Sequence, residues 1–460
     1  MDPATGQPRD TWGSKVAFIL AAAGSAIGLG NIWGFPTVAG QNGGAAFLAI
    51  YLVAVAFIGA PVMLAELIEG RRTGRNPVGA FKALAPRTAW VFVGGLGVAT
   101  GLAILSFYSV IAGWTVSYIF KSAIGTFGPE ADTAAIFAEV AGNPIRAIGW
   151  HFGFMALTIY VVLGGVRDGI ERWTKVLMPV LFVLLVALAI RAVTLSGAAE
   201  GLEFYFKPDF SKVTGGVVLA AIGQAFFSLS LGMGAMITYG SYVSKRDDLV
   251  SSAAWVTAFD TTIAILAGLI IFPTLFHAGL EPGVGGPGMV FVVLTSLLSS
   301  IPPAPWGGIV FGTGFFMLLG IAALTSSVSL LEVPTSWAVD ERGWSRKRAA
   351  IMLGVIAFLL GIPSALANGA VPWLTNLPGV GTDFLTFLFT LFGQYSLVIG
   401  ALLISLFVGW VWGVRAAGEE VEVNDGKFPL GRLWAFLIRF ICPIAITAIL
   451  LNLVWGLVGA

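Results

Sequence analysis

The sequence predicts an all-α membrane protein with eleven transmembrane helices, and three observations support this fold class. Of the 460 residues, 57% are hydrophobic and only 11% are charged, whereas a soluble domain carries about 25% charged residues. Apolar runs of about 20 residues, the length that crosses a bilayer as a helix, recur along the whole chain. Lys and Arg are abundant in every second connection between these runs, as expected for the two sides of a membrane.

The apolar runs define the expected helices in chain order, each to within a few residues. They lie near 13–38, 43–70, 88–121, 147–165, 170–196, 214–242, 250–276, 306–339, 347–366, 383–413 and 432–457. The connections between them are too short for a separate soluble domain. We therefore expect all of the function to lie within the helices.

The basic residues test this count of spans, because Lys and Arg collect on the cytoplasmic side. With the N-terminus inside, one of the 25 Lys and Arg, Arg439, falls in the last span and five fall in outside connections. The outside residues are Lys121, Arg146, Arg191, Lys207 and Lys212. The others all lie inside. We expect a multi-pass protein of the inner (plasma) membrane, with a cytoplasmic N-terminus and an external C-terminus.

Two of the spans are interrupted by residues that weaken helices. The first contains GSAIGLGNIWGFP (Gly24 to Pro36), and the sixth contains GQAFFSLSLGMGAMITYGSYV (Gly223 to Val243). Small residues can simply let membrane helices pack closely. Polar interruptions at corresponding positions in two halves are instead typical of inverted-repeat transporters, whose free helix ends bind ions and substrate. The sequence therefore predicts a binding site where the two breaks meet.

These segments, together with SFYSVIAGW, GIERWTKVLMP and ALTSSVSLLEVP, resemble the neurotransmitter:sodium symporters, and more closely their prokaryotic amino-acid transporter branch. The resemblance runs from Trp12 to about Pro443. It implies two inverted five-helix repeats with broken first and sixth helices, followed by one extra helix. The implied units are residues 1–200, 201–415 and 416–460.

The resemblance also implies two sodium sites, and oxygen ligands suit this hard cation. One site would be completed by the substrate carboxylate; its protein ligands would be the Ala26 carbonyl, Asn31, Ser228 and Asp260. The other would use the carbonyls of Gly24, Ile27 and Ala322 with the hydroxyls of Thr325 and Ser326.

Asp260 lies in the middle of its span, and an ionisable residue at that depth indicates a functional site. The alternative is a structural carboxylate held by hydrogen bonds. Many family members have a neutral amide at this position and recruit chloride to balance the charge. Here a carboxylate is already present, and Ala264, one turn further, has no hydroxyl to bind an anion. We expect transport that does not depend on chloride.

The resemblance assigns the remaining pocket residues to three parts of an α-amino acid. Its carboxylate would be held by the amides of Leu29 and Gly30 and the Tyr108 hydroxyl. Its ammonium group would be held by the carbonyls of Ala26, Phe227 and Ser230 and the Ser326 hydroxyl. Its side chain would lie among Ser25, Ile104, Phe227, Met233, Ser329 and Leu330. This wall carries no charge, so we expect a large aliphatic or aromatic substrate. For Ile104 and Leu330, ordinary core packing is an equally good explanation.

Two gates are expected on opposite sides of this pocket. Arg9 and Asp340 match the cytoplasmic ion pair of the family, with Trp12 and Tyr242 nearby, although such residues are also common at membrane interfaces. On the outer side, Gly34 stands where the family has an arginine, and the matching TFLFTLFGQYS segment has no acid. We expect apolar or water-mediated closure there. Glu66 is expected to anchor the broken first helix, and Glu332 to be a packing residue.

The function that these observations favour is sodium-coupled symport of a hydrophobic L-amino acid into the cell by alternating access. A channel and a sodium-coupled carrier of another small zwitterion are the alternatives. An enzyme is not expected, because the two histidines lie far apart and Cys442 is the single cysteine. Expected partners are the amino acid and the lipid bilayer, with a homodimer as an open possibility. The net charge of +1 gives no reason to expect nucleic acid.

Overall fold

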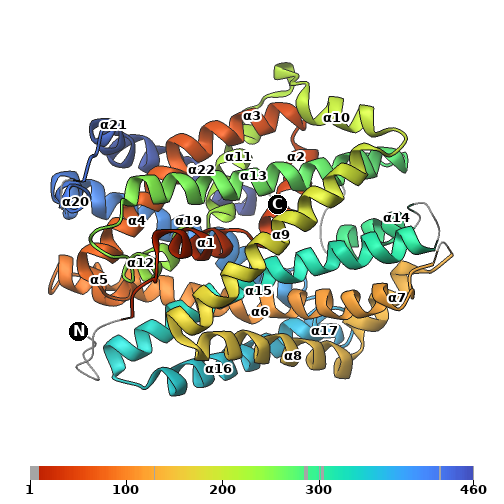
Figure 1. Cartoon of the computed structure of the whole chain (residues 1–460), viewed down its shortest axis with the longest axis horizontal. Helices are drawn as coiled ribbons and strands as arrows, with labels where there is room; N and C mark the ends of the chain where they lie inside the picture. Colours follow the sequence, from red (N-terminus) through yellow and green to blue (C-terminus); the bar gives the residue numbers. More distant parts are fainter. Residues whose placement is uncertain are drawn as a thin grey trace.

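The structure is a computed structural model that describes residues 10–128, 130–283, 288–299, 301, 305–423 and 426–458. All regular elements in these ranges are helical. Figure 1 shows the long helices packed side by side along one axis, with the connecting helices gathered at the two ends of the bundle. The fold class predicted from composition is therefore confirmed.

Nine helical runs of the described residues are long and apolar enough to cross a membrane. They are Ala45–Thr73 (α3 and α4), Val91–Ala123 (α6), Pro144–Leu163 (α8), Gly165–Val193 (α9 with the segment before it), Leu249–His277 (α13), Trp306–Arg342 (α15), Arg346–Leu366 (α16), Phe384–Val411 (α18 and α19) and Gly431–Trp455 (α21 and α22). The bent pair Lys15–Ala26 and Gly30–Gln41 forms a tenth span if its halves are taken together. The count of eleven remains a prediction, because the halves of the sixth span are too short for this criterion.

The first span breaks where the sequence predicts. Helix α1 (Lys15–Ala26) ends at Ala26, and the backbone of the next residue, Ile27, is extended (φ −74°, ψ 105°). A π-helical segment, Gly30–Gly34, then leads into α2 (Phe35–Gln41). The two halves are bent by 55° relative to each other. Carbonyls at the end of α1 and amides at the start of the second half are therefore left without ordinary helical partners.

The sixth span breaks by a different backbone geometry. Helix α11 (Gly215–Ser228) ends, and α12 (Ala235–Gly240) begins after a non-helical stretch. Within that stretch Ser230 has φ 53°, Gly232 has φ 90° and Gly234 has φ 76°. Glycine adopts such values without the steric cost that a side chain imposes. The glycines that mark this break in the sequence therefore make its backbone path possible.

The broken helices are enclosed by the long ones. Helix α1 packs against α9, α13 and α15, while α11 packs against α3, and α12 against α4. The α4–α12 contact is especially close: a Cβ atom added at Gly70 would come within 2.0 Å of the Ile237 carbonyl oxygen, and one at Gly240 within 2.7 Å of the Leu67 carbonyl. Both breaks are thus buried in protein, which a membrane requires of irregular backbone.

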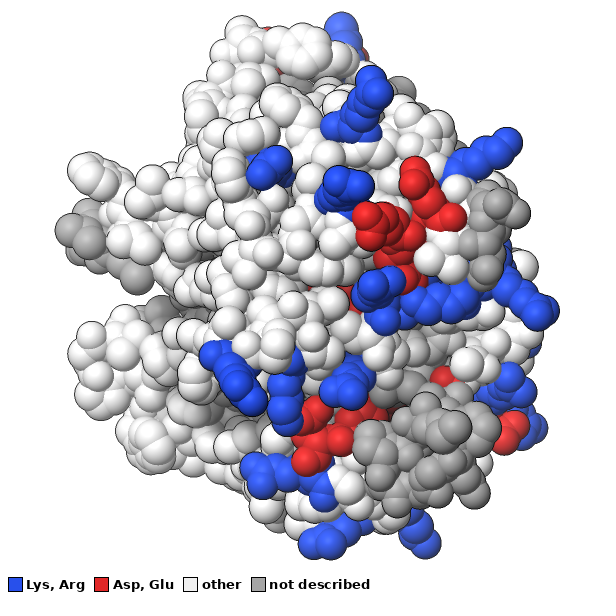
Figure 2. Space-filling view, turned by 90° about the vertical axis from the view of Figure 1, so that its left-hand side faces the viewer, with Lys and Arg blue, Asp and Glu red and all other residues white. Residues whose placement is uncertain are grey.

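One end of the bundle carries many charged side chains. Figure 2 shows Lys and Arg gathered, with acidic groups among them, on the end of the molecule at the left of Figure 1. Helices α5 (Pro77–Leu84) and α20 (Val414–Val421) lie at this end. The opposite end carries α7 (Thr133–Gly142), α10 (Ala198–Phe206) and α14 (Thr295–Ser299). We refer to the first as the basic end.

Candidate functional site at the two helix breaks

The two breaks meet at a buried network of polar side chains. The Asn31 amide nitrogen donates to Asp260 Oδ1 at 2.7 Å and to the Ser228 hydroxyl at 2.8 Å. The Ser228 hydroxyl donates to Asp260 Oδ2 at 2.8 Å, and Tyr51 donates to the Ser228 hydroxyl at 3.2 Å. The network therefore joins the first span, the sixth span and α13, with Tyr51 of α3 supporting it.

Asp260 gives this network its charge. Asn31, Ser228 and Asp260 are each 0% exposed, and within the described part of the chain no basic side chain forms an ion pair with Asp260. A buried carboxylate needs compensation by polar groups or a cation. Ala26, also buried, ends α1, where helix carbonyls lack partners. Carboxylate, amide and hydroxyl oxygens fit a hard cation such as sodium at this point.

A second group of oxygens lies between α1 and α15. The Ser326 hydroxyl donates toward the carbonyls of Gly24 at 3.4 Å and Ile27 at 3.0 Å. The Thr325 hydroxyl donates to the Ala322 carbonyl at 3.1 Å. Because the end of α1 carries the negative end of the helix dipole, these hydroxyls and carbonyls also suit a cation. The structure thus brings together all five residues that the resemblance places in the second ion site.

Two backbone amides of the first break find side-chain acceptors, one of them on α6. The Leu29 N–H donates to the Tyr108 hydroxyl at 3.1 Å, and the Gly28 N–H to Asn31 Oδ1 at 3.1 Å. A Cβ added at Gly28 would lie 2.7 Å from the Ser326 hydroxyl oxygen and 2.8 Å from the Tyr108 hydroxyl oxygen. Only glycine fits here, so the backbone approaches two hydroxyls directly. These are donors and acceptors suited to the carboxylate and ammonium groups of a small zwitterion.

The two breaks also bond to each other. The Ser230 hydroxyl donates to the Ser25 carbonyl at 3.2 Å, and the Ser326 hydroxyl lies 3.3 Å from the same carbonyl. Among the described residues the Ser25 hydroxyl, although buried, has no hydrogen-bond partner. A buried unpaired hydroxyl is unfavourable, and it marks this position as one able to receive a further polar group.

The apolar wall predicted around the site is partly assembled. Phe227 covers Gly30, since a Cβ at Gly30 would lie 2.6 Å from its ring. Ile104, Met233 and Leu330 are 7%, 3% and 3% exposed. Ser329 turns its hydroxyl to the Ser326 carbonyl of its own helix at 2.8 Å. Burial agrees with a pocket wall, and for Ile104 and Leu330 it agrees equally with core packing.

Of the residues predicted for the cytoplasmic gate, Tyr242 lies against Trp12. The Trp12 indole N–H donates to the Tyr239 carbonyl at 3.1 Å, and its backbone N–H to the Tyr242 carbonyl at 3.1 Å. Asp340 accepts hydrogen bonds from the backbone and the side chain of Asn76 at 2.9 and 3.1 Å. Its predicted partner Arg9 lies outside the described residues.

Glu332, interpreted from the sequence as a packing residue, is instead part of this network. Its carboxylate is 0% exposed and accepts hydrogen bonds from Tyr242 at 2.7 Å and from Arg346 at 2.6 and 3.1 Å. A carboxylate inside a membrane helix needs a partner, so the presence of Glu332 in an apolar span could have indicated a buried ion pair. The partner, Arg346, lies at the start of the next span, 14 residues along the chain. The periodicity of a single helix cannot predict such a pairing.

The prediction for Glu66 was wrong in its partner. The carboxylate accepts a hydrogen bond from the Gly232 N–H at 2.8 Å, so it supports the broken sixth span rather than the first. Gly232 has a positive φ, and its amide is not used by a helix. A buried N–H must find an acceptor, and Glu66 of α4 supplies it.

Two aromatic rings lie near Gly34, at the position that the sequence analysis assigns to the outer gate. The ring of Phe227 meets that of Phe389 edge-on, with centroids 5.7 Å apart, and a Cβ at Gly34 would lie 3.9 Å from Phe227. Phe389 belongs to the TFLFTLFGQYS segment that lacks an acid. The apolar contact expected from the sequence is present at this position.

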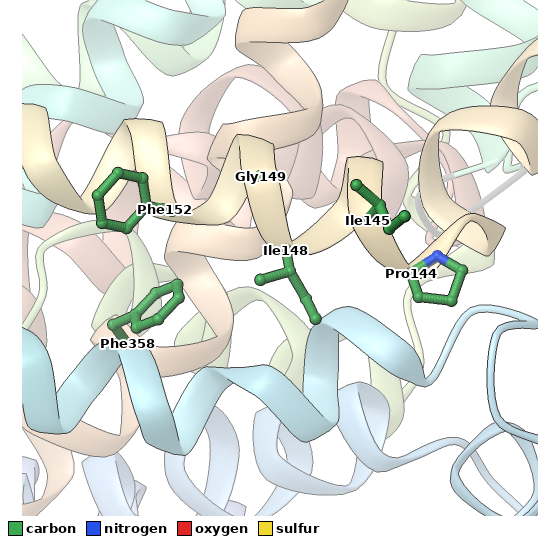
Figure 3. Close-up of a pocket in the computed structure, with 6 residues that line it drawn as sticks. All are labelled: Pro144, Ile145, Ile148, Gly149, Phe152 and Phe358. Carbon is green, nitrogen blue, oxygen red and sulfur yellow. The ribbon is translucent and has the colours of Figure 1, made fainter.

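The molecule also has an apolar groove that is separate from the breaks. It lies between α8 and α16 and is lined by Pro144, Ile145, Ile148, Gly149, Phe152 and Phe358 (Figure 3). Ile145 is 85% and Phe152 61% exposed. Exposed apolar side chains on transmembrane helices are suited to contact with lipid, so this groove does not compete with the central site.

Comparison with known proteins agrees with this geometry. The profile of the family described as "Sodium:neurotransmitter symporter family" matches residues 9–130 and 143–457. The chain is 41% identical to an uncharacterized sodium-dependent transporter, YhdH, of Bacillus subtilis (strain 168), over 96% of this chain and 97% of that protein. It is 28% identical to the sodium-dependent serotonin transporter of Drosophila melanogaster, over 98% of this chain and 77% of that protein.

A solved structure is similar over nearly the whole length. The crystal structure of MhsT in complex with L-phenylalanine superimposes with a TM-score of 0.88 and 49% sequence identity, covering 97% of this chain and 100% of that one. These matches include both broken spans and α13, from which the central network is built. The chain belongs to the sodium:neurotransmitter symporter family, and is thus a multi-pass, sodium-dependent membrane transporter rather than an enzyme.

Proposed function

We propose that the protein couples sodium entry to the import of a hydrophobic L-amino acid, with a large aliphatic or aromatic side chain, by alternating access. The observation that carries this proposal is the meeting of two broken spans, where backbone amides, carbonyls and a buried carboxylate converge on one place. A continuous pore would need polar groups along its length, whereas these cluster at a single depth.

Two sodium ions are proposed at the two oxygen clusters. The first would be held by the Ala26 carbonyl, Asn31, Ser228 and Asp260, the second by the carbonyls of Gly24, Ile27 and Ala322 with the hydroxyls of Thr325 and Ser326. When bound, sodium supplies positive charge beside the substrate carboxylate. The protein residues would orient the substrate and exclude water. Both oxygen clusters lie at the ends of half-helices, which would move as the site opens to one side or the other.

The substrate carboxylate is proposed to bind at the Leu29 and Gly30 amides and the Tyr108 hydroxyl. The ammonium group would then face carbonyls near Ala26, Phe227 and Ser230, with the Ser326 hydroxyl. Support for a hydrophobic side chain comes from the wall of Ile104, Met233 and Leu330, which carries no charge. The similar protein MhsT was solved with L-phenylalanine, which fits a pocket of this character.

Chloride independence is proposed on the same electrostatic ground. Several relatives at 26–27% identity are named sodium- and chloride-dependent transporters. In this chain Asp260 provides a fixed negative charge at the proposed first sodium site, and Ala264 is buried without a hydroxyl. A second anion there would add repulsion instead of balance.

We also propose how the protein is oriented in the membrane and where its two structural repeats lie. The basic end is assigned to the cytoplasm, with Trp12, Tyr242 and Asp340 closing the inner path, in which Arg9 would take part. Residues 1–200 and 201–415 are assigned to the two inverted repeats and 416–460 to the eleventh helix. Support comes from the broken span that opens each half of the chain.

The test is uptake of labelled phenylalanine, leucine and tryptophan into proteoliposomes. Uptake should require an inward sodium gradient, stop when potassium replaces sodium, and persist when gluconate replaces chloride. Uptake without sodium would refute coupling, and rapid flux that does not saturate would favour a channel. Transport of a small polar zwitterion in place of these amino acids would leave coupling intact and overturn the substrate class.

A further inference from the structure

One basic residue of the last span has no acidic partner. Arg439 is partly buried, and within the described part of the chain its side chain forms no ion pair. The guanidinium Nε is enclosed and has no hydrogen-bond partner there either. An arginine keeps its charge in a protein, and a charge within a membrane span requires a compensating group.

The acids at this end of the molecule have other partners. Helix α20 carries Glu419 and Glu420. Arg415 lies 3.6 Å from Glu419, and Arg71 donates to Glu420 at 3.0 Å. The residues that the structure describes thus provide no negative charge for Arg439.

The contact that Arg439 does make is with an aromatic ring. Its guanidinium carbon lies 4.5 Å from the centroid of the Trp410 ring, and the Trp410 indole N–H donates to the Arg439 carbonyl at 2.9 Å. Both segments are π-helical here, Phe407–Val411 and Leu437–Ile441, and such widened turns are frequent at functional sites. The ring orients the guanidinium but has no net charge to neutralise it.

The depth of Arg439 in the membrane follows from the two spans that meet at this contact. Residues 440–458 carry no charge and are about 28 Å long as a helix, close to the hydrocarbon thickness of about 30 Å. Trp410 is the penultimate residue of the span Phe384–Val411, and tryptophan is enriched at the membrane interface. The guanidinium therefore lies at the depth of lipid phosphates, near the basic end, where α21 (Gly431–Phe436) lies (Figure 1).

The surface around the guanidinium is aromatic and open. Trp410, Phe436 and Phe440 are 54%, 52% and 41% exposed. The Phe440 ring meets Trp410 edge-on, with centroids 5.5 Å apart, and lies 5.7 Å from the Phe436 ring. The two terminal nitrogens of Arg439, unlike Nε, are not enclosed. A soluble anion would gain nothing from the aromatic rings, whereas a phospholipid offers a phosphate group beside apolar chains.

We propose that Arg439 and Trp410 form a binding site for one anionic phospholipid, with its phosphate on the guanidinium and its upper acyl chain against the aromatic rings. A phosphate group accepts two parallel N–H bonds from a guanidinium. Phosphatidylglycerol would neutralise the arginine, whereas phosphatidylcholine brings an ammonium group of its own. The proposal requires only that the chain spans a membrane, so it does not depend on the proposed substrate or on sodium coupling.

The test is lipid binding by the purified, delipidated protein in detergent, followed by native mass spectrometry and thermal unfolding. The wild type should retain one phosphatidylglycerol and unfold at a higher temperature when this lipid is added. Arg439→Gln should bind it at least about tenfold more weakly, since bonds to a charged group are lost, and Arg439→Lys should be intermediate. Arg415→Gln is the control, because its side chain is 94% exposed at the same end. Equal binding by the wild type and Arg439→Gln would overturn the proposal.

Two competitors test the choice of ligand. Phosphatidylcholine should not displace phosphatidylglycerol, and inorganic phosphate should not raise the unfolding temperature. Stabilisation by inorganic phosphate alone would assign Arg439 to a soluble anion, and equal retention of both lipids would refute recognition by charge. Light scattering should give the same mass for the wild type and Arg439→Gln; a smaller mass for the variant would make this surface an interface between copies. If Arg439→Gln does not fold, Arg439→Lys and the wild type's choice between the two lipids decide.

Discussion

Single positions in this protein are constrained by how closely the backbone must approach its neighbours. Gly28 lies between two hydroxyl groups, and Asp260 accepts hydrogen bonds from Asn31 and Ser228 but forms no ion pair with a basic side chain of the described residues. Substitutions at these two positions separate steric from electrostatic contributions to the site, because one adds volume without charge and the other removes charge with little change in shape.

Gly28→Ala should abolish uptake or raise its KM at least about tenfold. The added methyl group would displace the Ser326 and Tyr108 hydroxyls, and overpacking costs about 1–3 kcal/mol. The matched control is Gly95→Ala on the exposed face of α6, where a Cβ meets nothing within 4 Å. Uptake kinetics and thermal unfolding should leave Gly95→Ala unharmed. Wild-type kinetics in Gly28→Ala would mean that the two hydroxyls take no part.

Asp260→Asn should raise the half-saturating sodium concentration about tenfold or more, because one elementary charge is lost at a buried cation site, and tenfold corresponds to about 1.4 kcal/mol. Chloride should not rescue it, since Ala264 offers no donor. Sodium titration of uptake in gluconate and in chloride measures both effects. Asp383→Asn is the control: this carboxylate caps α18, far along the chain from the breaks. Equal sodium dependence in both variants would contradict the assignment.

At the scale of helices, the sequence was sufficient to predict where the two spans break. It was not sufficient to predict which side chains pair between different helices. Glycine, serine and proline within long apolar runs predicted where α1 ends and where α11 gives way to α12. Oxygen-bearing residues near those breaks could be matched to ion and substrate sites. The partners of Glu66 and Glu332 could not be predicted, because they depend on which helices meet in space, and Gly232 and Arg346 lie on other spans.

The pair that joins α15 and α16 offers a test at this scale. Glu332→Leu should destabilise the protein by about 3 kcal/mol, because it leaves Arg346 without its carboxylate in a mostly buried position. The double variant Glu332→Leu and Arg346→Leu should recover much of that loss, since two apolar side chains replace the pair. Thermal unfolding in one detergent compares the variants. Purely additive losses would show that the two residues are not coupled.

The aromatic contact between the sixth and tenth spans offers another test at the scale of helices. Gly34→Arg should reduce uptake strongly, because its charge would enter the aromatic contact of Phe227 and Phe389 without an acid to pair it. Gly34→Ala is the control, as its Cβ would make an ordinary contact at 3.9 Å. Uptake by both variants is to be compared at equal surface expression. Normal transport by Gly34→Arg would mean that the contact opens more widely than proposed.

The whole molecule is polarised from end to end, and this polarity makes a prediction about topology. Ser211, beyond α10, and Thr88, beyond α5, are exposed at opposite ends. The natural Cys442 is buried, so cysteines introduced at these two positions can be labelled selectively. In intact cells a membrane-impermeant thiol reagent should label Ser211→Cys, and Thr88→Cys only after permeabilisation, because Lys and Arg are retained inside.

The two positions are separated by α6, α8 and α9, an odd number of crossings, so their labelling should always be opposite. The reversed pattern would invert the proposed orientation and assign the basic end to the outside. Labelling of both from outside would mean that one of the three helices does not cross. Since α9 packs against α1, such a result would also change the surroundings of the first broken span, on which the proposed sodium coupling depends.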